Sequence, residues 1–158
     1  MPHFAKLEEN NIVLEVQVFS QEDVAANGGD YSTGAETWVE NWSGHNNWKQ
    51  CSYNTHNGQH LNSGTPLRAN YPAIGDVYDE VNNIFYRPKD EGNVSWSLNT
   101  TTGNFDPPSP MPPYEDSTYE VDGVTIKYVI EWNESTQNWE GYSLSLIHIS
   151  EPTRLRRI

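Results

Sequence analysis

The clearest hydrophobic pattern lies near the N-terminus, in residues 12–19 (IVLEVQVF). Alternate positions there are apolar, namely Leu14, Val16 and Val18. A period of two predicts a strand with one apolar and one mixed face. A shorter strand is expected at residues 4–7, and the turn at 8–11 contains asparagines that tolerate left-handed backbone. Together these segments predict an N-terminal β-hairpin.

Two short helices are predicted after this hairpin. The first begins after Ser20, a good N-cap residue, and ends at the Asn-Gly-Gly-Asp run of residues 27–30. The second spans residues 35–42 and is followed by Gly44, a typical C-terminal glycine. Its apolar face is formed by Trp38, Val39 and Trp42. Helices of about two turns are marginal alone, so this helix should pack on the hairpin.

The middle of the chain, residues 48–88, places aromatic residues between asparagines, glycines and prolines. We expect one strand at 48–53 and two short strands on either side of residues 79–83. Glycines and Pro66 between them interrupt regular structure. This stretch therefore predicts a loop-rich β segment held together by aromatic side chains.

A weak internal repeat follows. An Asp or Asn after a large residue is separated by five residues from an aromatic one, at Asp79/Phe85, Asn99/Phe105 and Asn133/Trp139. Turn-forming residues lie between them, so we predict three small hairpins, each held by a cross-strand apolar pair. A polyproline II spacer at 107–113 and a hairpin at 121–131 with an Asp-Gly turn complete the pattern.

These elements predict an α+β fold that is mostly β. We expect an N-terminal α+β domain at 1–90 and hairpin repeats at 91–143. Hydrophobic residues are only 35% of the chain and aromatic residues 12%, which predicts a thin, aromatic core. Short hairpins are barely stable alone, so they should pack together or on a partner.

The formal net charge of −13 disfavours nucleic acids and anionic membranes as partners, because both attract basic surfaces. A single cysteine, Cys51, excludes an intramolecular disulfide. The chain has no apolar run of about 18 residues and does not open on a signal-peptide pattern, so we expect a soluble protein that is not exported by the ordinary secretory route.

Two clusters could carry metal or acid–base chemistry. His56 and His60 have a metal-ligand spacing if helical, but they lie among asparagines and glycine, so exposed loop histidines are expected. A metal site shared between chains is the alternative. Asp76, Asp79 and Glu80 could form an acid–base pair or a calcium site, although a solvated turn is the simpler interpretation.

Cys51 and three tryptophans are the other candidates for a functional site. The neighbours of Cys51 give no reason for a reactive thiolate. The tryptophans at 96, 132 and 139 either form core or offer a sugar-stacking platform, and the scarcity of aliphatic residues favours core. We therefore predict no catalytic residues, no cofactor and no bound metal.

The last residues have a different character. Leu144–Arg154 reads LSLIHISEPTR and resembles a translated sequencing-library adapter. This resemblance implies that residues 144–158 are a non-native tail and that the natural chain is truncated near Ser143. A native apolar strand with a basic end is the alternative. A foreign segment carries no information about the native fold.

Six segments carry a resemblance to one family: HFAKLEENNIVLEV, NWKQCSYNT, NSGTPLRANYPAIGDVYD, IFYRPK, SWSLNTTTGNFDPPSPMP and IEWNESTQNWE. In order and spacing they resemble a family of small proteins of tailed marine phages, including cyanophages. The resemblance covers about residues 1–140. The chain departs from the pattern with Cys51 where Thr is usual and with an insertion around 121–128.

The resemblance implies a non-enzymatic structural component of the virion, such as a capsid, neck or tail accessory protein. Such a protein is made in the cytoplasm of the host bacterium, and its partners would be other virion proteins and copies of itself. The candidate interaction surface comprises Tyr78, Phe85, Trp96, Trp132 and Trp139. The alternatives are a carbohydrate- or host-surface-binding module of a tail fibre, which would bind a host-surface glycan, and a small hydrolase using Asp76 and Glu80.

Overall fold

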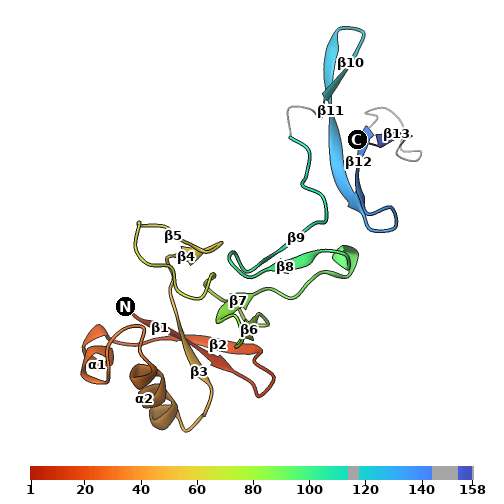
Figure 1. The fold of residues 1–158 in the computed structure, drawn as a ribbon. Coiled ribbons are helices and arrows are strands. Elements are labelled where there is room, and N and C mark those ends of the chain that lie inside the picture. Colours follow the sequence, from red (N-terminus) through yellow and green to blue (C-terminus); the bar gives the residue numbers. More distant parts are fainter. Residues whose placement is uncertain (114–117, 144–152, 158) are drawn as a thin grey trace. The chain divides into compact units, whose positions relative to one another are not determined.

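The chain is an α+β protein built mostly of small antiparallel sheets, with two α-helices near the N-terminus (Figure 1). The computed structural model describes residues 1–113, 118–143 and 153–157. Two compact units are present: residues 1–88 with 98–104, and residues 89–97 with those described from 105 onward. The predicted division at residue 90 is close to the first break, but the turn at 98–104 belongs to unit 1.

Unit 1 contains a three-stranded sheet in the order β2-β1-β3. Its strands are β1 (His3–Leu7), β2 (Val13–Val18) and β3 (Trp48–Cys51). Both neighbours run antiparallel to β1, so the predicted N-terminal hairpin is confirmed. The third strand ends at Cys51, two residues earlier than expected.

A β-bulge changes which side chains of β2 face the core. The β1–β2 register shifts near the start of β2, which leaves one extra residue on that strand. Val13 and Val16 therefore contact the same core, while Leu14 and Val18 are exposed. The predicted apolar face of Leu14, Val16 and Val18 is wrong, because a one-residue slip exchanges the two faces of a strand.

Both predicted helices are present, as α1 (Gln21–Ala26) and α2 (Thr33–Ser43). The hydroxyls of Ser20 and Ser32 accept hydrogen bonds from backbone N–H groups in the first turns, so each serine is an N-cap. Gly44 ends α2 in the left-handed conformation, with φ of 69°.

One of two core clusters lies under the helices. Its buried members are Phe4, Val24, Ala35, Val39 and Trp48. Phe19 and Trp38 pack against it. Trp42, which was expected on the buried face, is 62% exposed and only its ring edge approaches Phe19, with centroids 5.3 Å apart.

The other core cluster joins the sheet to the middle of the chain. Its buried members are Ala5, Leu7, Val13, Cys51, Tyr78 and Phe85. Tyr78 and Phe85 come from β6 (Val77–Asp79) and β7 (Ile84–Tyr86), the two predicted short strands. The sequence placed Tyr78 and Phe85 on a candidate interaction surface, but residues of β1, β2 and β3 cover them. Tyr78 and Phe85 are therefore core residues and not surface ones.

The loop between β3 and β6 contains a small hairpin that the sequence did not reveal. It pairs β4 (Thr55–His56) with β5 (Gln59–His60). A further pair, β8 (Ser97–Asn99) and β9 (Asn104–Asp106), forms the second repeat hairpin. The Asn70 amide donates to the carbonyl oxygens of Phe85 (3.1 Å) and Thr102 (2.9 Å), which ties two repeat hairpins together.

Unit 2 contains a 3-10 turn, η1 (Glu91–Asn93), and a sheet in the order β10-β11-β12-β13. Its strands are β10 (Thr118–Val121), β11 (Val124–Asn133), β12 (Asn138–Ser143) and β13 (Thr153–Arg157). Asp122 and Gly123 form the predicted turn, both with positive φ. Of the predicted non-native tail, residues 144–152 and 158 lie outside the described residues, and the rest is β13 at the edge of the sheet.

The predicted repeat is confirmed as a shared turn. In each hairpin, the side-chain oxygen of the first Asp or Asn accepts two backbone N–H groups two and three residues later. These acceptors are Asp79, Asn99 and Asn133. Two of the predicted cross-strand pairs are direct partners in register, Tyr78 with Phe85 and Trp132 with Trp139.

Candidate functional site

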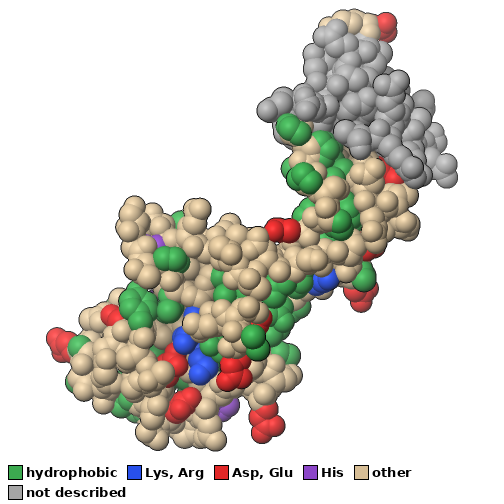
Figure 2. Space-filling model, viewed as in Figure 1, with side chains coloured by type: hydrophobic (Ala, Val, Ile, Leu, Met, Phe, Trp, Pro, Cys, Tyr) green, Lys and Arg blue, Asp and Glu red, His purple; other side chains and the backbone are tan. Residues whose placement is uncertain are grey.

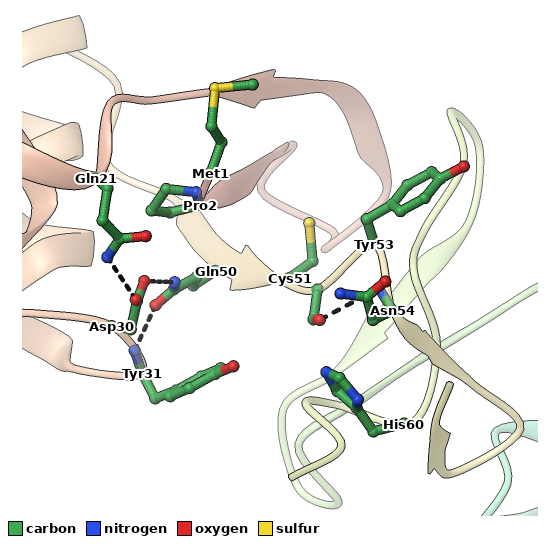
Figure 3. A pocket seen from close by; sticks show the side chains of 11 residues that line it. Met1, Pro2, Gln21, Asp30, Tyr31, Gln50, Cys51, Tyr53, Asn54 and His60 are labelled. Atoms are coloured by element: carbon green, nitrogen blue, oxygen red, sulfur yellow. Dashed lines mark hydrogen bonds between the residues drawn. The ribbon is translucent and has the colours of Figure 1, made fainter. Parts of the chain in front are cut away.

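A pocket of about 170 Å³ opens in unit 1 beside the end of β3 (Figure 3). Its polar lining comes from three parts of the chain: the start of α1, the loop before α2, and residues 50–54 with His60. The Tyr31 ring lies at its rim, whereas the Tyr53 ring points away from the other lining residues, and both are largely exposed, at 59% and 64%. No pattern in the sequence predicted this pocket, because its residues meet only through the fold.

Hydrogen bonds fix one wall of the pocket. The Asp30 carboxylate accepts from the side-chain amides of Gln21 (2.6 Å) and Gln50 (2.9 Å). The Gln50 oxygen in turn accepts the backbone N–H of Tyr31 at 2.6 Å. This network connects α1, the loop before α2 and β3, so the wall is formed before any ligand arrives.

Cys51 lies next to this wall but is not a nucleophile. Burial raises the pKa of the Cys51 thiol to about 12. The neutral thiol therefore predominates at physiological pH, and thiolate chemistry needs the ionised form. The sequence-based interpretation of Cys51 as unreactive agrees with this environment.

His56 and His60 lie on opposite strands of the β4–β5 hairpin, but they are not direct partners, since His56 pairs with Gln59. The His60 Nδ1 atom accepts the backbone N–H groups of Asn62 (3.2 Å) and Gly64 (3.0 Å). Among the described residues, no group of three His, Cys, Asp or Glu side chains is arranged to hold a metal ion. The absence of a metal in the native protein stays a prediction.

The acidic residues 76–80 serve turns. Asp76 is nearly buried, and its carboxylate accepts the backbone N–H of Ala73 at 2.8 Å. A hydrogen bond from the Asn82 side chain lowers the pKa of Asp79, which caps its hairpin turn. These contacts give both carboxylates a structural role in turns, but the burial of Asp76 differs from the solvated turn that the sequence predicted.

The three tryptophans of unit 2 pack against one another. The ring centroids of Trp96, Trp132 and Trp139 lie 5.3–6.1 Å apart, with interplanar angles of 58–84°. The indole N–H of Trp132 donates to Glu134 at 2.8 Å and lowers the pKa of that carboxyl. Trp139 is buried and donates to the Ser109 carbonyl at 2.9 Å. Tilted rings that contact each other form a small core, whereas sugar stacking needs an open ring face.

A buried ion pair that the sequence did not reveal connects α2, β3 and two loops of unit 1. One guanidinium nitrogen of Arg68 lies 2.6 Å from a Glu36 oxygen and also donates to the Gln50 carbonyl. The same side chain donates to Asn83 at 2.8 Å and lies 5.5 Å from the centre of the Tyr78 ring. Sequence spacing gives no signal for this network, because its members lie on α2, β3 and two loops.

No protein-family model, curated protein or solved structure matches this chain. Membership of the phage family therefore remains a prediction from the resemblance. None of the described helices is long and apolar enough to cross a lipid bilayer.

Proposed function

We propose that the protein is a non-enzymatic structural component of a tailed-phage particle, where it binds other virion proteins and copies of itself. The family resemblance of residues 1–140 supports this function. The structural observation that supports it most is the sheet of unit 2, which has no helix in the described part of that unit.

Three strands of this sheet, β10, β11 and β12, precede the predicted non-native tail, and both described α-helices belong to unit 1. Within the described part of unit 2, η1 and the ends of the β8–β9 hairpin are the other regular elements. A stable sheet normally buries one face against a second layer. A neighbouring chain in a symmetric ring or fibre would provide that layer.

The acidic surface makes self-association depend on the salt concentration. Figure 2 shows acidic side chains at several separate places on one face of the molecule, with hydrophobic side chains between them. With a formal net charge of −13, copies of the chain repel one another at low ionic strength. Salt screens this repulsion, so self-association should strengthen between about 10 and 150 mM salt.

Within the predicted interaction surface, a substitution of Trp132 best distinguishes a core role from a contact role. Trp132 is partly exposed, whereas Trp139, Tyr78 and Phe85 are buried. A core role predicts that Trp132→Ala lowers the free energy of unfolding by about 3–5 kcal/mol. A contact role predicts retained stability and reduced incorporation into particles. Trp42→Ala, at an exposed tryptophan of unit 1, is the matched control.

Mass spectrometry of purified phage particles tests the assignment directly. We expect the protein in the particles, and light scattering of the purified chain should show oligomers. Presence in infected cells but absence from particles would contradict the proposal.

A further inference from the structure

The pocket beside β3 has the size of a site for one small ring. Its volume of about 170 Å³ is below the roughly 300–1,000 Å³ of sites for drug-sized ligands. It is lined mainly by amide, carboxylate, hydroxyl and imidazole groups. Such a lining suits a small ligand that carries many hydroxyl groups.

The fixed wall offers hydrogen bonds of both kinds. A glutamine side chain has two N–H donors and an oxygen acceptor. Gln21 uses one donor on Asp30 within the described part of the chain, so its second N–H and its oxygen can reach a ligand. Figure 3 shows His60 across the pocket from Gln21. Because His60 Nδ1 accepts two backbone N–H groups, the neutral ring carries its proton on Nε2 and offers a further donor.

One tyrosine ring, that of Tyr31, supplies an apolar face at the rim. The Tyr53 ring is engaged elsewhere, by an edge contact with Tyr71 and a stacked contact with His3, at centroid distances of 5.5 and 6.1 Å. Tyr31 has φ of 62°, a conformation that bulky residues rarely adopt and that Asn or Gly adopts easily. Folding alone does not call for tyrosine at this position, so its exposed ring points to binding.

Charge selects the class of ligand. Among the described residues that line the pocket, none is a lysine or an arginine, and the Met1 α-ammonium and the Asp30 carboxylate have opposite formal charges, so no net charge favours an anion or a cation. Both Asp30 oxygens already accept glutamine N–H groups, which reduces their attraction for a cation. A neutral ligand with vicinal hydroxyls and an apolar C–H face remains.

We propose that this pocket binds one ring of a neutral saccharide, with Tyr31 against one face of the sugar ring and Gln21, Gln50 and His60 on its hydroxyls. The site belongs to unit 1, whereas the tryptophans considered above belong to unit 2. It does not depend on the virion assignment, because a failure to bind sugar would leave incorporation into particles unaffected.

Saturation-transfer NMR on the full chain tests the proposal. The probes are the methyl glycosides of glucose, galactose and N-acetylglucosamine, each up to about 10 mM, which detects millimolar dissociation constants. Glucose 6-phosphate and choline represent anionic and cationic ligands. We expect at least one neutral glycoside to bind more tightly than either charged probe.

Variants locate the site. Tyr31→Asn should weaken binding at least tenfold, and Trp42→Ala, which alters a similarly exposed aromatic residue outside the pocket, should leave it unchanged. Tyr31→Asn should keep or raise the melting temperature, since Asn tolerates the backbone conformation. If a tyrosine variant unfolds, the exposed Gln21→Ala provides the same test. Absence of binding by all three glycosides, tighter binding of a charged probe, or binding that survives the pocket variants overturns the proposal.

Discussion

Replacing Arg68 by Met should lower the free energy of unfolding by about 3–5 kcal/mol, because it leaves a buried carboxylate without its partner. The side chains of Arg68 and Glu36 are only 12% and 9% exposed. Lys49 Nζ lies 3.7 Å from the other Glu36 oxygen and would compensate part of the loss. We therefore expect a value near the lower end of this range.

Other effects of the substitution are small or cancel. Met fills a similar volume, and it has the same backbone cost as Arg at the Arg68 φ of 53°. The hydrogen bonds to Gln50 and Asn83 are lost as well. Because a domain of this kind is stable by about 5–15 kcal/mol in total, the variant should remain measurable but fragile.

Urea unfolding followed by tryptophan fluorescence measures the effect. Arg87→Met is the matched control, since Arg87 is 81% exposed and lies 3.8 Å from Asp76. It should cost less than about 1 kcal/mol. Adding Glu36→Gln to Arg68→Met should recover at least about 1 kcal/mol, the coupling expected for contacting residues. A cost for Arg68→Met no larger than that for Arg87→Met would refute the reasoning.

Four further predictions follow from single features. Deleting residues 144–158 should change the melting temperature by no more than a few degrees, because the segment resembles a foreign tail and β13 is an edge strand. Elemental analysis after dialysis against a chelator should find no stoichiometric zinc or iron at His56 and His60; retained metal would contradict this. Because burial raises the pKa of Cys51 from 9.0 to about 12, its contribution to stability should be complete below about pH 9 and fall as the pH rises toward 12, a loss that Cys51→Ala removes in urea titrations at each pH. Gln137→Gly should raise the free energy of unfolding by about 0.5–1 kcal/mol in the same assay, since Gln137 has φ of 47°.

Local patterns predicted the helices and hairpins, because caps and turns depend on residues close in sequence. Ser20, Gly44 and the repeat asparagines therefore had the expected places. The side-chain environments were predicted less well. A single bulge in β2 places Val13 in the core and leaves Leu14 exposed. The burial of Tyr78 depends on residues of β1 and β2, which lie far earlier in the chain.

The candidate site could not be predicted from local sequence patterns either, because its residues meet only in the folded chain. Tyr31, Gln50 and His60 come from separate segments and carry no shared spacing. One signal was present: a large aromatic residue directly after Gly28-Gly29-Asp30, where turn chemistry favours small residues. A bulky side chain in a turn that does not need it marks a position where function, and not folding, selects the residue.

The three repeat turns show how one local pattern acquires different long-range roles. Each turn places one residue in the left-handed region, and these residues are Asn83, Gly103 and Gln137. Asn83 accepts hydrogen bonds from Tyr78 and Arg68, so its side chain connects the turn to the buried ion pair. Gly103 is required because a Cβ there would collide with the Asn70 amide and the Phe85 carbonyl. Gln137 has no comparable long-range contact within the described part of the chain, so its turn is free of the constraint that holds the first two hairpins in unit 1. The three hairpins therefore share one turn, while the residue at the left-handed position differs with the long-range contacts that each turn makes.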